Sequence, residues 1–167
     1  MDTLVDSLPP PVTEMSQLSW FIGQWAVVSR YLNDDQVWVE ETITAEHTPI
    51  LGGHVIFEHF GGPLFGKPFE AWSLRKFNPS SSRWEQRWVD VTPGGFADWT
   101  GKWNADEGVF TGHPNRVLND DGSLKDSAAR EMFYDIEADR FSWKYERTED
   151  GGKSWRAIWT LAYTRQS

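Results

Sequence analysis

The chain of 167 residues contains no cysteine. Disulfide bonds, thiolate metal sites and cysteine nucleophiles are therefore excluded, and a chain without disulfides is compatible with the cytosol. The sequence also lacks any run of 18 apolar residues, and residues 1–13 have neither the basic nor the apolar stretch of a secretion signal. We therefore expect a cytoplasmic protein that does not enter a membrane.

Basic residues are scarce as well. The sequence has 16 Lys and Arg against 25 Asp and Glu, which gives a formal net charge of −9. Proteins that bind nucleic acids neutralise phosphates with clustered Lys and Arg, so nucleic acid is not an expected partner. The glycine-rich segments 61–66 and 93–95 precede strand-like segments and no helix, so we interpret them as hairpin turns and not as phosphate loops.

Only four histidines are present, at positions 47, 54, 59 and 113. The stretch HVIFEH at 54–59 superficially resembles zinc-protease motifs, but those need a helix, and this stretch follows two glycines in a strand-like segment. We therefore expect no metal and no cofactor. His59 has the same strand parity as Val55 and Phe57, so it is a candidate interior group, with a hydrogen-bonded core or rim histidine as the alternative.

The abundant feature is aromatic: eleven tryptophans lie mostly in short segments of alternating polar and apolar residues. Period-two alternation bounded by Gly, Pro, Asn and Asp predicts ten strands, at 24–31, 37–47, 53–60, 68–77, 83–91, 95–104, 108–113, 130–136, 140–148 and 154–164. Apolar residues at helical spacing predict one short helix before Gly23. A long antiparallel meander normally closes to remove its edges.

The expected fold is therefore all-β: a single ten-stranded antiparallel up-and-down β-barrel, with the short N-terminal helix plugging one end. Residues 1–13 form a disordered or extended leader, and residues 14–167 form the barrel domain. The polar stretch 114–129 is expected to be a lid near one mouth or a plain mobile connection.

Strand parity indicates which residues face the interior. Trp84, Gln86, Trp88 and Asp90 share one face of their strand. Two later strands give further inward sets: Phe141, Trp143, Tyr145 and Arg147, then Trp155, Ala157, Trp159, Leu161 and Tyr163. Large rings need a wide interior, which predicts an aromatic-lined cavity that holds a few polar groups. Asp90, at a strand end, is expected to pair with Arg147, with a turn amide near Pro93, or with a ligand.

Two functions fit this interior. The first is binding of a hydrophobic small molecule, aromatic or polyene, by stacking on Trp88, Trp143 and Trp159 and by hydrogen bonds from Gln86, Tyr134 and Tyr145. The second is a cofactor-independent cyclase, isomerase or hydratase. Its catalytic residues would be Asp90 as general base with a raised pKa, Tyr145 as hydrogen-bond donor, and His59.

Three further tryptophans, Trp38, Trp72 and Trp99, fall on a face that parity does not settle. If they point outward, they mark a homodimer patch or are exposed incidentally. The segment 148–155 (TEDGGKSW) is similar to an Asp-box hairpin and occurs once, so we interpret it as a device that fixes strand register.

Taken together, the segments LSWFIGQW, ILGGHVIFEHF, RKFNPSSSRWEQRWVD, GKWNADEGVFTGH and FSWKYERTEDGGKSW resemble calycin-like proteins near nitrobindin and the fatty-acid-binding proteins. The resemblance covers residues 15–165 and implies a ten-stranded barrel with an interior site for a hydrophobic or planar molecule. Val27 and Ser29 replace glycines of the nitrobindin start motif, and residues 114–167 contain no histidine to ligate haem. The resemblance therefore does not imply haem.

Overall fold

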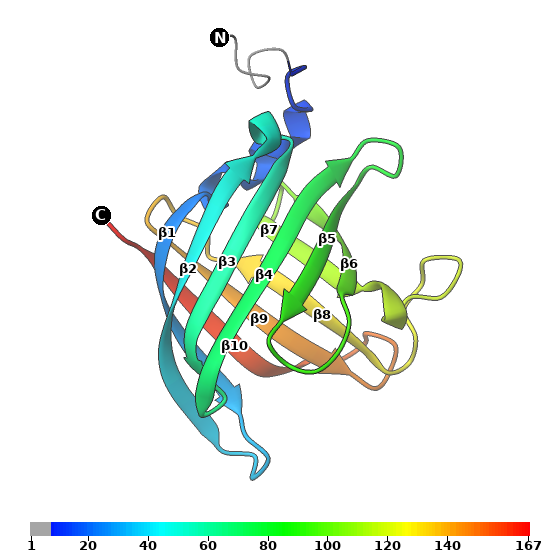
Figure 1. Cartoon of the computed structure of the whole chain (residues 1–167). Helices are drawn as coiled ribbons and strands as arrows, with labels where there is room; N and C mark the ends of the chain where they lie inside the picture. Colours follow the sequence, from blue (N-terminus) through cyan, green and yellow to red (C-terminus); the bar gives the residue numbers. More distant parts are fainter. Residues whose placement is uncertain (1–7) are drawn as a thin grey trace.

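The computed structural model describes residues 8–167, and ten antiparallel strands form a closed barrel (Figure 1). The strands are β1 (Gly23–Leu32), β2 (Trp38–Ile50), β3 (Val55–Leu64), β4 (Lys67–Asn78), β5 (Arg83–Asp90), β6 (Ala97–Asn104), β7 (Val109–Pro114), β8 (Ala128–Tyr134), β9 (Arg140–Thr148) and β10 (Arg156–Arg165). Each strand pairs with its neighbours in sequence, and β1 pairs with β10. The prediction of an all-β, ten-stranded, closed antiparallel barrel is confirmed.

Closure is made by seven residue pairs between β1 and β10, from Trp25 opposite Arg165 to Tyr31 opposite Trp159. The pairing satisfies the backbone groups of both terminal strands, so neither strand is left as an open edge. Most strands alternate between buried and more exposed residues. On β4, for example, Phe69, Ala71, Ser73, Arg75 and Phe77 are buried and their neighbours are exposed.

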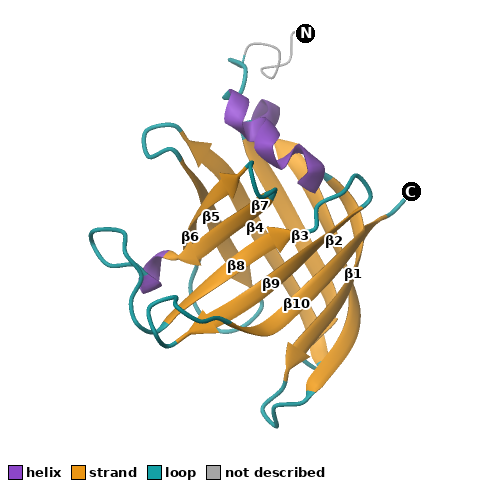
Figure 2. Cartoon of the chain, turned by 180° about the vertical axis from the view of Figure 1, so that it is seen from behind, coloured by secondary structure: helices purple, strands orange, loops and turns teal. Residues whose placement is uncertain are grey.

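The helix expected before Gly23 is present as η2 (Thr13–Phe21), but its turns are 3-10 and Leu18 interrupts them with non-helical angles. Two shorter 3-10 turns follow, η3 (Leu51–Gly53) and η4 (Asn115–Val117). Figure 2 shows η2 (purple) at the end of the barrel nearest the N-terminus. Leu18 and Phe21 are buried, and the Trp84 indole N–H donates a hydrogen bond to Gln17 Oε1.

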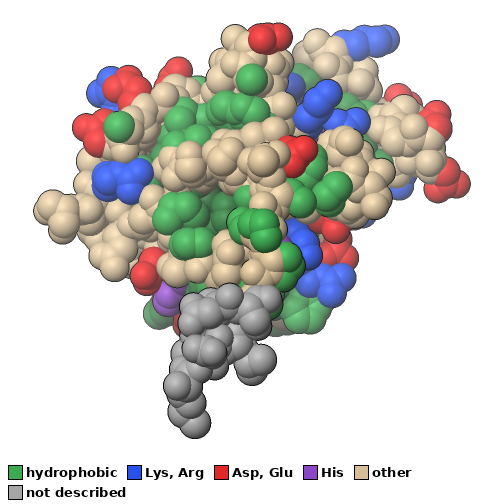
Figure 3. Space-filling view, turned by 90° about the horizontal axis from the view of Figure 1, so that it is seen from above, with side chains coloured by type: hydrophobic (Ala, Val, Ile, Leu, Met, Phe, Trp, Pro, Cys, Tyr) green, Lys and Arg blue, Asp and Glu red, His purple; other side chains and the backbone are tan. Residues whose placement is uncertain are grey.

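The core beneath η2 is aromatic. The Phe21 ring stacks on the His47 ring with centroids 3.6 Å apart, and the Phe141 ring stacks on Tyr163 at 4.1 Å. Trp25 is fully buried, and its indole N–H donates to the Phe21 carbonyl. Seen from this end, hydrophobic side chains gather in the middle of the face, and charged side chains lie mostly around its rim (Figure 3).

The hairpin turn predicted at 61–66 is present but shorter, because β3 continues through Leu64 and the chain reverses at Phe65 and Gly66. Both turn residues have positive φ, 57° and 71°. Gly62 serves a packing role in the strand, since a Cβ there would lie 3.0 Å from Ile43 Cγ2. Glycine at this point permits a close approach of β2 and β3 and does not mark a chain reversal.

Of the expected leader, residues 1–7 lie outside the described part of the chain. Residues 8–12 carry no helix or strand, and the Pro9 carbonyl lies 2.8 Å from His54 Nε2. Within residues 8–167, no helix has the length and apolar character needed to cross a membrane.

Candidate functional site

The barrel encloses a cavity of about 330 Å³ with a largely aromatic wall. It extends from the middle of β3 and β4 toward the β3–β4 turn and the β5–β6 loop, which lie at the end of the barrel opposite η2. Residues of seven strands and two connecting turns line it: Glu58, Phe60, Phe65, Phe69, Arg75, Gln86, Trp88, Asp90, Thr92, Ala97, Trp99, Glu131, Phe133, Trp143, Tyr145, Trp159, Leu161 and Tyr163. Its volume lies in the range of small-molecule sites.

Five of the six residues predicted to contact a ligand line this cavity: Gln86, Trp88, Trp143, Tyr145 and Trp159. Trp143 and Trp159 meet edge to face with centroids 4.9 Å apart. The Trp159 indole N–H donates to Ser29 Oγ at 2.9 Å, which fixes the orientation of that ring. Strand parity in β5, β9 and β10 thus places these five side chains around one cavity, and their contact with a ligand stays a prediction.

Tyr134, the sixth residue, lies outside the cavity. Its neighbour Phe133 is buried, so Tyr134 projects from the other face of β8, where Lys144 lies over its ring. Among the three tryptophans of unsettled parity, Trp99 lines the cavity, whereas Trp38 and Trp72 are exposed.

The expectation that His59 faces the interior is wrong. On β3 the inward residues are Ile56, Glu58 and Phe60, and His59 is exposed on the outer face, hydrogen-bonded to Glu70. Strand β3 starts only after η3, and the run Val55-Ile56-Phe57 is apolar on both faces, so apolar character alone does not select the parity. The proposed catalytic set of Asp90, His59 and Tyr145 is therefore not brought together.

Asp90 lines the mouth of the cavity but has its own partners. Its carboxylate accepts hydrogen bonds from the Trp88 indole N–H, and from the backbone N–H and hydroxyl of Thr92. Partial burial opposes ionisation, but these hydrogen bonds outweigh it and lower the pKa of Asp90. The turn-amide alternative is thus the observed one, and Arg147 is exposed on β9. A pKa shifted in this direction does not fit the general base that we expected.

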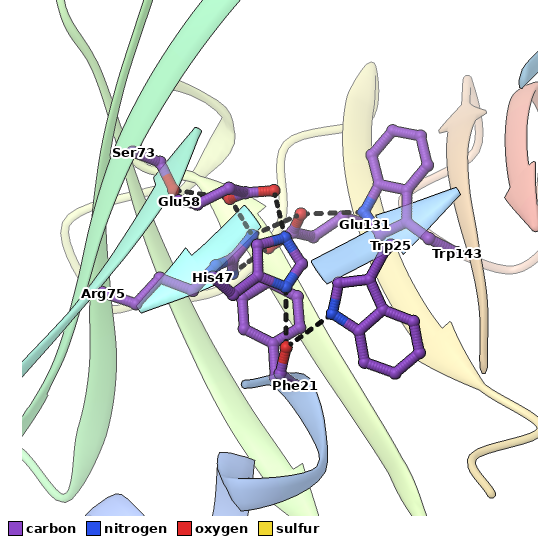
Figure 4. A network of polar contacts seen from close by, with 8 residues as sticks. All are labelled: Phe21, Trp25, His47, Glu58, Ser73, Arg75, Glu131 and Trp143. Carbon is purple, nitrogen blue, oxygen red and sulfur yellow. Dashed lines mark hydrogen bonds and ion pairs between the residues drawn. The ribbon is translucent and has the colours of Figure 1, made fainter. Parts of the chain in front are cut away.

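A buried polar network lies at the inner end of the cavity (Figure 4). Arg75 of β4 donates from Nη1 to Glu131 Oε1 at 2.9 Å and from Nη2 to Glu131 Oε2 at 3.4 Å. The Trp143 indole N–H donates to the same carboxylate at 2.9 Å. All three side chains are less than a tenth exposed. The pairing is two-pronged, and such charge-assisted contacts are the strong ones in proteins.

Glu58 extends this network toward η2. Its carboxylate accepts a hydrogen bond from Ser73 Oγ at 2.6 Å and lies 3.7 Å from Arg75 Nη2. On the far side, His47 Nε2 is 3.4 Å from Glu58 Oε1, and His47 Nδ1 lies 2.7 Å from the Phe21 carbonyl. Burial alone would raise the pKa of Glu58, but His47, Arg75 and Ser73 together lower it to about 2.

Neighbouring aromatic groups and a glycine complete the environment of the network. The Arg75 guanidinium lies 5.1 Å from the centroid of Phe133 and 5.4 Å from that of Phe21. A Cβ at Gly112 would lie 3.0 Å from Glu131 Oε1, so glycine on β7 leaves space for that carboxylate. Burial, with the charges of Glu58 and Glu131, raises the pKa of Tyr163 well above its usual value, so its hydroxyl stays neutral.

Two polar atoms of the lining are buried without a hydrogen-bond partner among the described residues: Gln86 Oε1 and Arg75 Nε. Buried polar atoms are normally paired, so atoms of this kind in a cavity wall mark places where a bound molecule can be held. The described residues contain no group of three or more His, Cys, Asp or Glu placed to hold a metal ion.

The sequence analysis missed Glu58, Arg75, Glu131 and His47. A signal was present for Arg75, because it has the same parity as Phe69, Ala71 and Phe77 in the predicted strand 68–77. A charged residue at an inward position requires a buried partner. Parity does not tell which residue supplies the partner, because Glu131 is 56 positions away along the chain.

A model of the family described as "Protein of unknown function (DUF1579)" matches residues 10–165. No curated protein matches the sequence. Among solved structures, the chain is similar to Rv2717c from M. tuberculosis, with 17% identity and a TM-score of 0.59. It is also similar to the S-type phycobiliprotein lyase CPES from Guillardia theta, with 12% identity and a TM-score of 0.57. Each alignment covers 94% of this chain and 99% of the other, and at these identities the likeness shows the fold alone.

Proposed function

The chain belongs to the DUF1579 family, and we propose that it binds a planar, largely hydrophobic small molecule inside its barrel. The observation that carries this proposal is the cavity of about 330 Å³, whose largely aromatic wall also includes Gln86, a buried amide with an unpartnered oxygen among the described residues. A site with this wall favours a ligand with extended flat apolar surface, and it orients that ligand through a few polar groups.

The aromatic side chains give the cavity its selectivity for flat molecules. Trp88, Trp143 and Trp159 supply large surfaces for stacking, and Tyr145 adds a hydroxyl beside them. Gln86 offers its free oxygen to a hydrogen-bond donor of the ligand. The fold likeness to a phycobiliprotein lyase adds bilin-like pigments to aromatic and polyene molecules as candidate ligands. It also supports a place for the chain among calycin-like barrels.

We infer that the ligand enters at the end of the barrel that carries the β3–β4 turn and the β5–β6 loop. Phe65 in that turn lines the cavity and is 40% exposed. Asp90 and Thr92 also line the cavity at this end. The opposite end is closed by η2, an inference supported by the buried Leu18 and Phe21 and by the hydrogen bond between Gln17 and Trp84.

Binding is tested by titrating the protein with biliverdin as a bilin and with all-trans retinol as a polyene, using tryptophan fluorescence quenching. We expect saturable quenching by at least one of them. Trp88→Ala should weaken the affinity for that ligand about two- to twelvefold, because an aromatic pair contributes about 0.5–1.5 kcal/mol beyond buried area. Trp72→Ala, which removes an exposed tryptophan on the outer face of β4, is the matched control and should leave affinity unchanged. Equal affinity of both variants would refute the site.

A further inference from the structure

The charge of the cavity wall constrains the ligand further. Three carboxylates line the cavity, Glu58, Asp90 and Glu131, and one guanidinium, Arg75, faces them. The carboxylates of Glu58 and Asp90 have lowered pKa values, and Glu131 accepts charge-assisted hydrogen bonds from Arg75, so all three are ionised. The ionised side chains of the wall therefore carry a net charge of −2.

His47 does not reverse this sign. It lies behind Glu58, with Nδ1 against the Phe21 carbonyl and Nε2 3.4 Å from the Glu58 carboxylate. A protonated His47 would bring the total to −1, and a neutral one leaves it at −2. In both states the buried surroundings of the ligand are negative, and in a low-dielectric interior this charge is weakly screened.

A ligand carboxylate would find no free cationic partner here. Both terminal nitrogens of Arg75 already donate to Glu131, and Nη2 also lies 3.7 Å from Glu58 Oε2. Only Nε lacks a partner among the described residues. The remaining N–H groups of a guanidinium that is already paired with carboxylates do not offset the repulsion between a buried ligand carboxylate and three others.

A ligand that is a cation, or that carries N–H donors, has suitable partners in the same wall. Gln86 is 8% exposed, and its Oε1 is buried in the wall with no partner among the described residues, so it is free to accept a hydrogen bond. The indole rings of Trp88, Trp99 and Trp143 line the same space, and the face of an indole ring attracts a cation. Carboxylates, a free amide oxygen and aromatic faces together form the environment that stabilises positive charge.

We propose that the cavity selects flat aromatic ligands whose buried edge is cationic or carries N–H donors, such as a protonated aminated N-heteroaromatic molecule, and that it rejects ligands with a buried carboxylate. This inference rests on the proposed binding function and narrows the ligand class of the same site. It also distinguishes this barrel from one built to hold an anionic head group.

The test uses three fused tricyclic molecules of similar size: 9-aminoacridine, a cation at pH 7; 9-anthracenemethanol, which is neutral; and 9-anthracenecarboxylate, an anion. Isothermal titration calorimetry at pH 7 and low salt gives the three dissociation constants. We expect the cation to bind at least tenfold more tightly than the neutral molecule, and the anion to bind more weakly still. A tenfold preference corresponds to about 1.4 kcal/mol.

Two variants assign any preference to the wall. Asp90→Asn removes one charge at the mouth while keeping an oxygen acceptor for the Thr92 amide, and Glu131→Gln removes one at the inner end. Each should reduce the ratio of cation to neutral affinity at least threefold. Asp106→Asn, in the exposed β6–β7 turn, makes the same chemical change outside the cavity and should leave the ratio unchanged. If Glu131→Gln does not fold, Asp90→Asn still decides the question.

The outcomes separate the two proposals. Equal affinity for all three molecules, or tighter binding of the anion, would refute the charge selection and leave the binding function standing. A ratio of cation to neutral affinity that Asp90→Asn leaves unchanged would also refute it, because the selectivity would then arise elsewhere. If none of the three molecules binds while biliverdin or retinol does, the ligand class is wrong; if no probe of either experiment binds, both proposals fail.

Discussion

Replacing Arg75 by methionine should strongly destabilise the protein, because this guanidinium is the cation between two buried carboxylates. Arg75, Glu58 and Glu131 are 3–4% exposed. Arg75 donates two hydrogen bonds to Glu131 and lies 3.7 Å from Glu58. Methionine keeps much of the side-chain volume but removes the charge and all five N–H donors.

The magnitude follows from what remains after the change. Glu131 would keep only the hydrogen bond from Trp143, and Glu58 would keep Ser73 and the neighbouring His47. Removing one partner of a buried ion pair typically costs about 3–5 kcal/mol, since the other charge is left unpaired in a poorly polarisable interior. Small domains are stable by about 5–15 kcal/mol, so this loss is a large fraction of the total.

The assay is equilibrium urea unfolding at pH 7, followed by tryptophan fluorescence. Arg87→Met is the matched control, because Arg87 also forms a two-pronged pair, with Asp98, but on the exposed outer face of β5. We expect the Arg75 variant to lose far more stability than the control. The double variant Arg75→Met/Glu131→Gln should regain part of the loss, because one unpaired charge is removed as well. Similar losses in both single variants would refute the reasoning.

Three further outcomes are expected. The pKa of Glu58 is lowered from 4.5 to about 2 in the folded state. The ionised carboxylate therefore contributes on the order of 3 kcal/mol to the free energy of unfolding above pH 4.5, and this contribution is lost as the pH falls toward 2. In urea unfolding at several pH values, the free energy of unfolding of Glu58→Gln should depend less on pH over this range than that of the unchanged protein. Gly101→Ala should lower the free energy of unfolding by about 1–3 kcal/mol, because the new methyl group would overlap the Phe110 ring. Gly94 has open space around it, so Gly94→Ala should leave the stability in thermal unfolding nearly unchanged. Asp150→Ala should speed amide hydrogen exchange in the β9–β10 hairpin, because the Asp150 carboxylate accepts hydrogen bonds from the Ser154 backbone N–H and hydroxyl. Unchanged protection of the hairpin amides would contradict the role of Asp150 as a turn cap.

The strands could be predicted from the sequence because their signal is local. Alternation of polar and apolar residues, interrupted by turn residues, placed all ten strands within a few residues of their observed bounds. The bounds of one turn were less accurate, because glycine occurs within strands as well as in turns. The hairpin turn was predicted over 61–66, yet Gly61 and Gly62 lie within β3, and only Phe65 and Gly66 form the reversal.

The aromatic residues of the cavity wall could also be predicted from the sequence. On β5, Trp84, Gln86 and Trp88 share a parity that their charged neighbours make unambiguous. On β3 the alternation does not decide which face points inward, and a charged residue such as Glu58 is normally expected on the outer face. The interior position of Glu58 is favourable only because His47, Ser73 and Arg75 reach it from the adjacent strands.

By itself, the order of residues determined that the chain forms ten strands and that a wall of indole rings faces inward, because alternation along one strand needs no knowledge of any other. The partners of the buried charges depend on the closed barrel. Ion pairs such as Arg75 with Glu131 join strands far apart in sequence, and a buried charge is tolerated only where such a partner is present. The sign of the cavity's charge is therefore a property of the assembled barrel and not of any single segment.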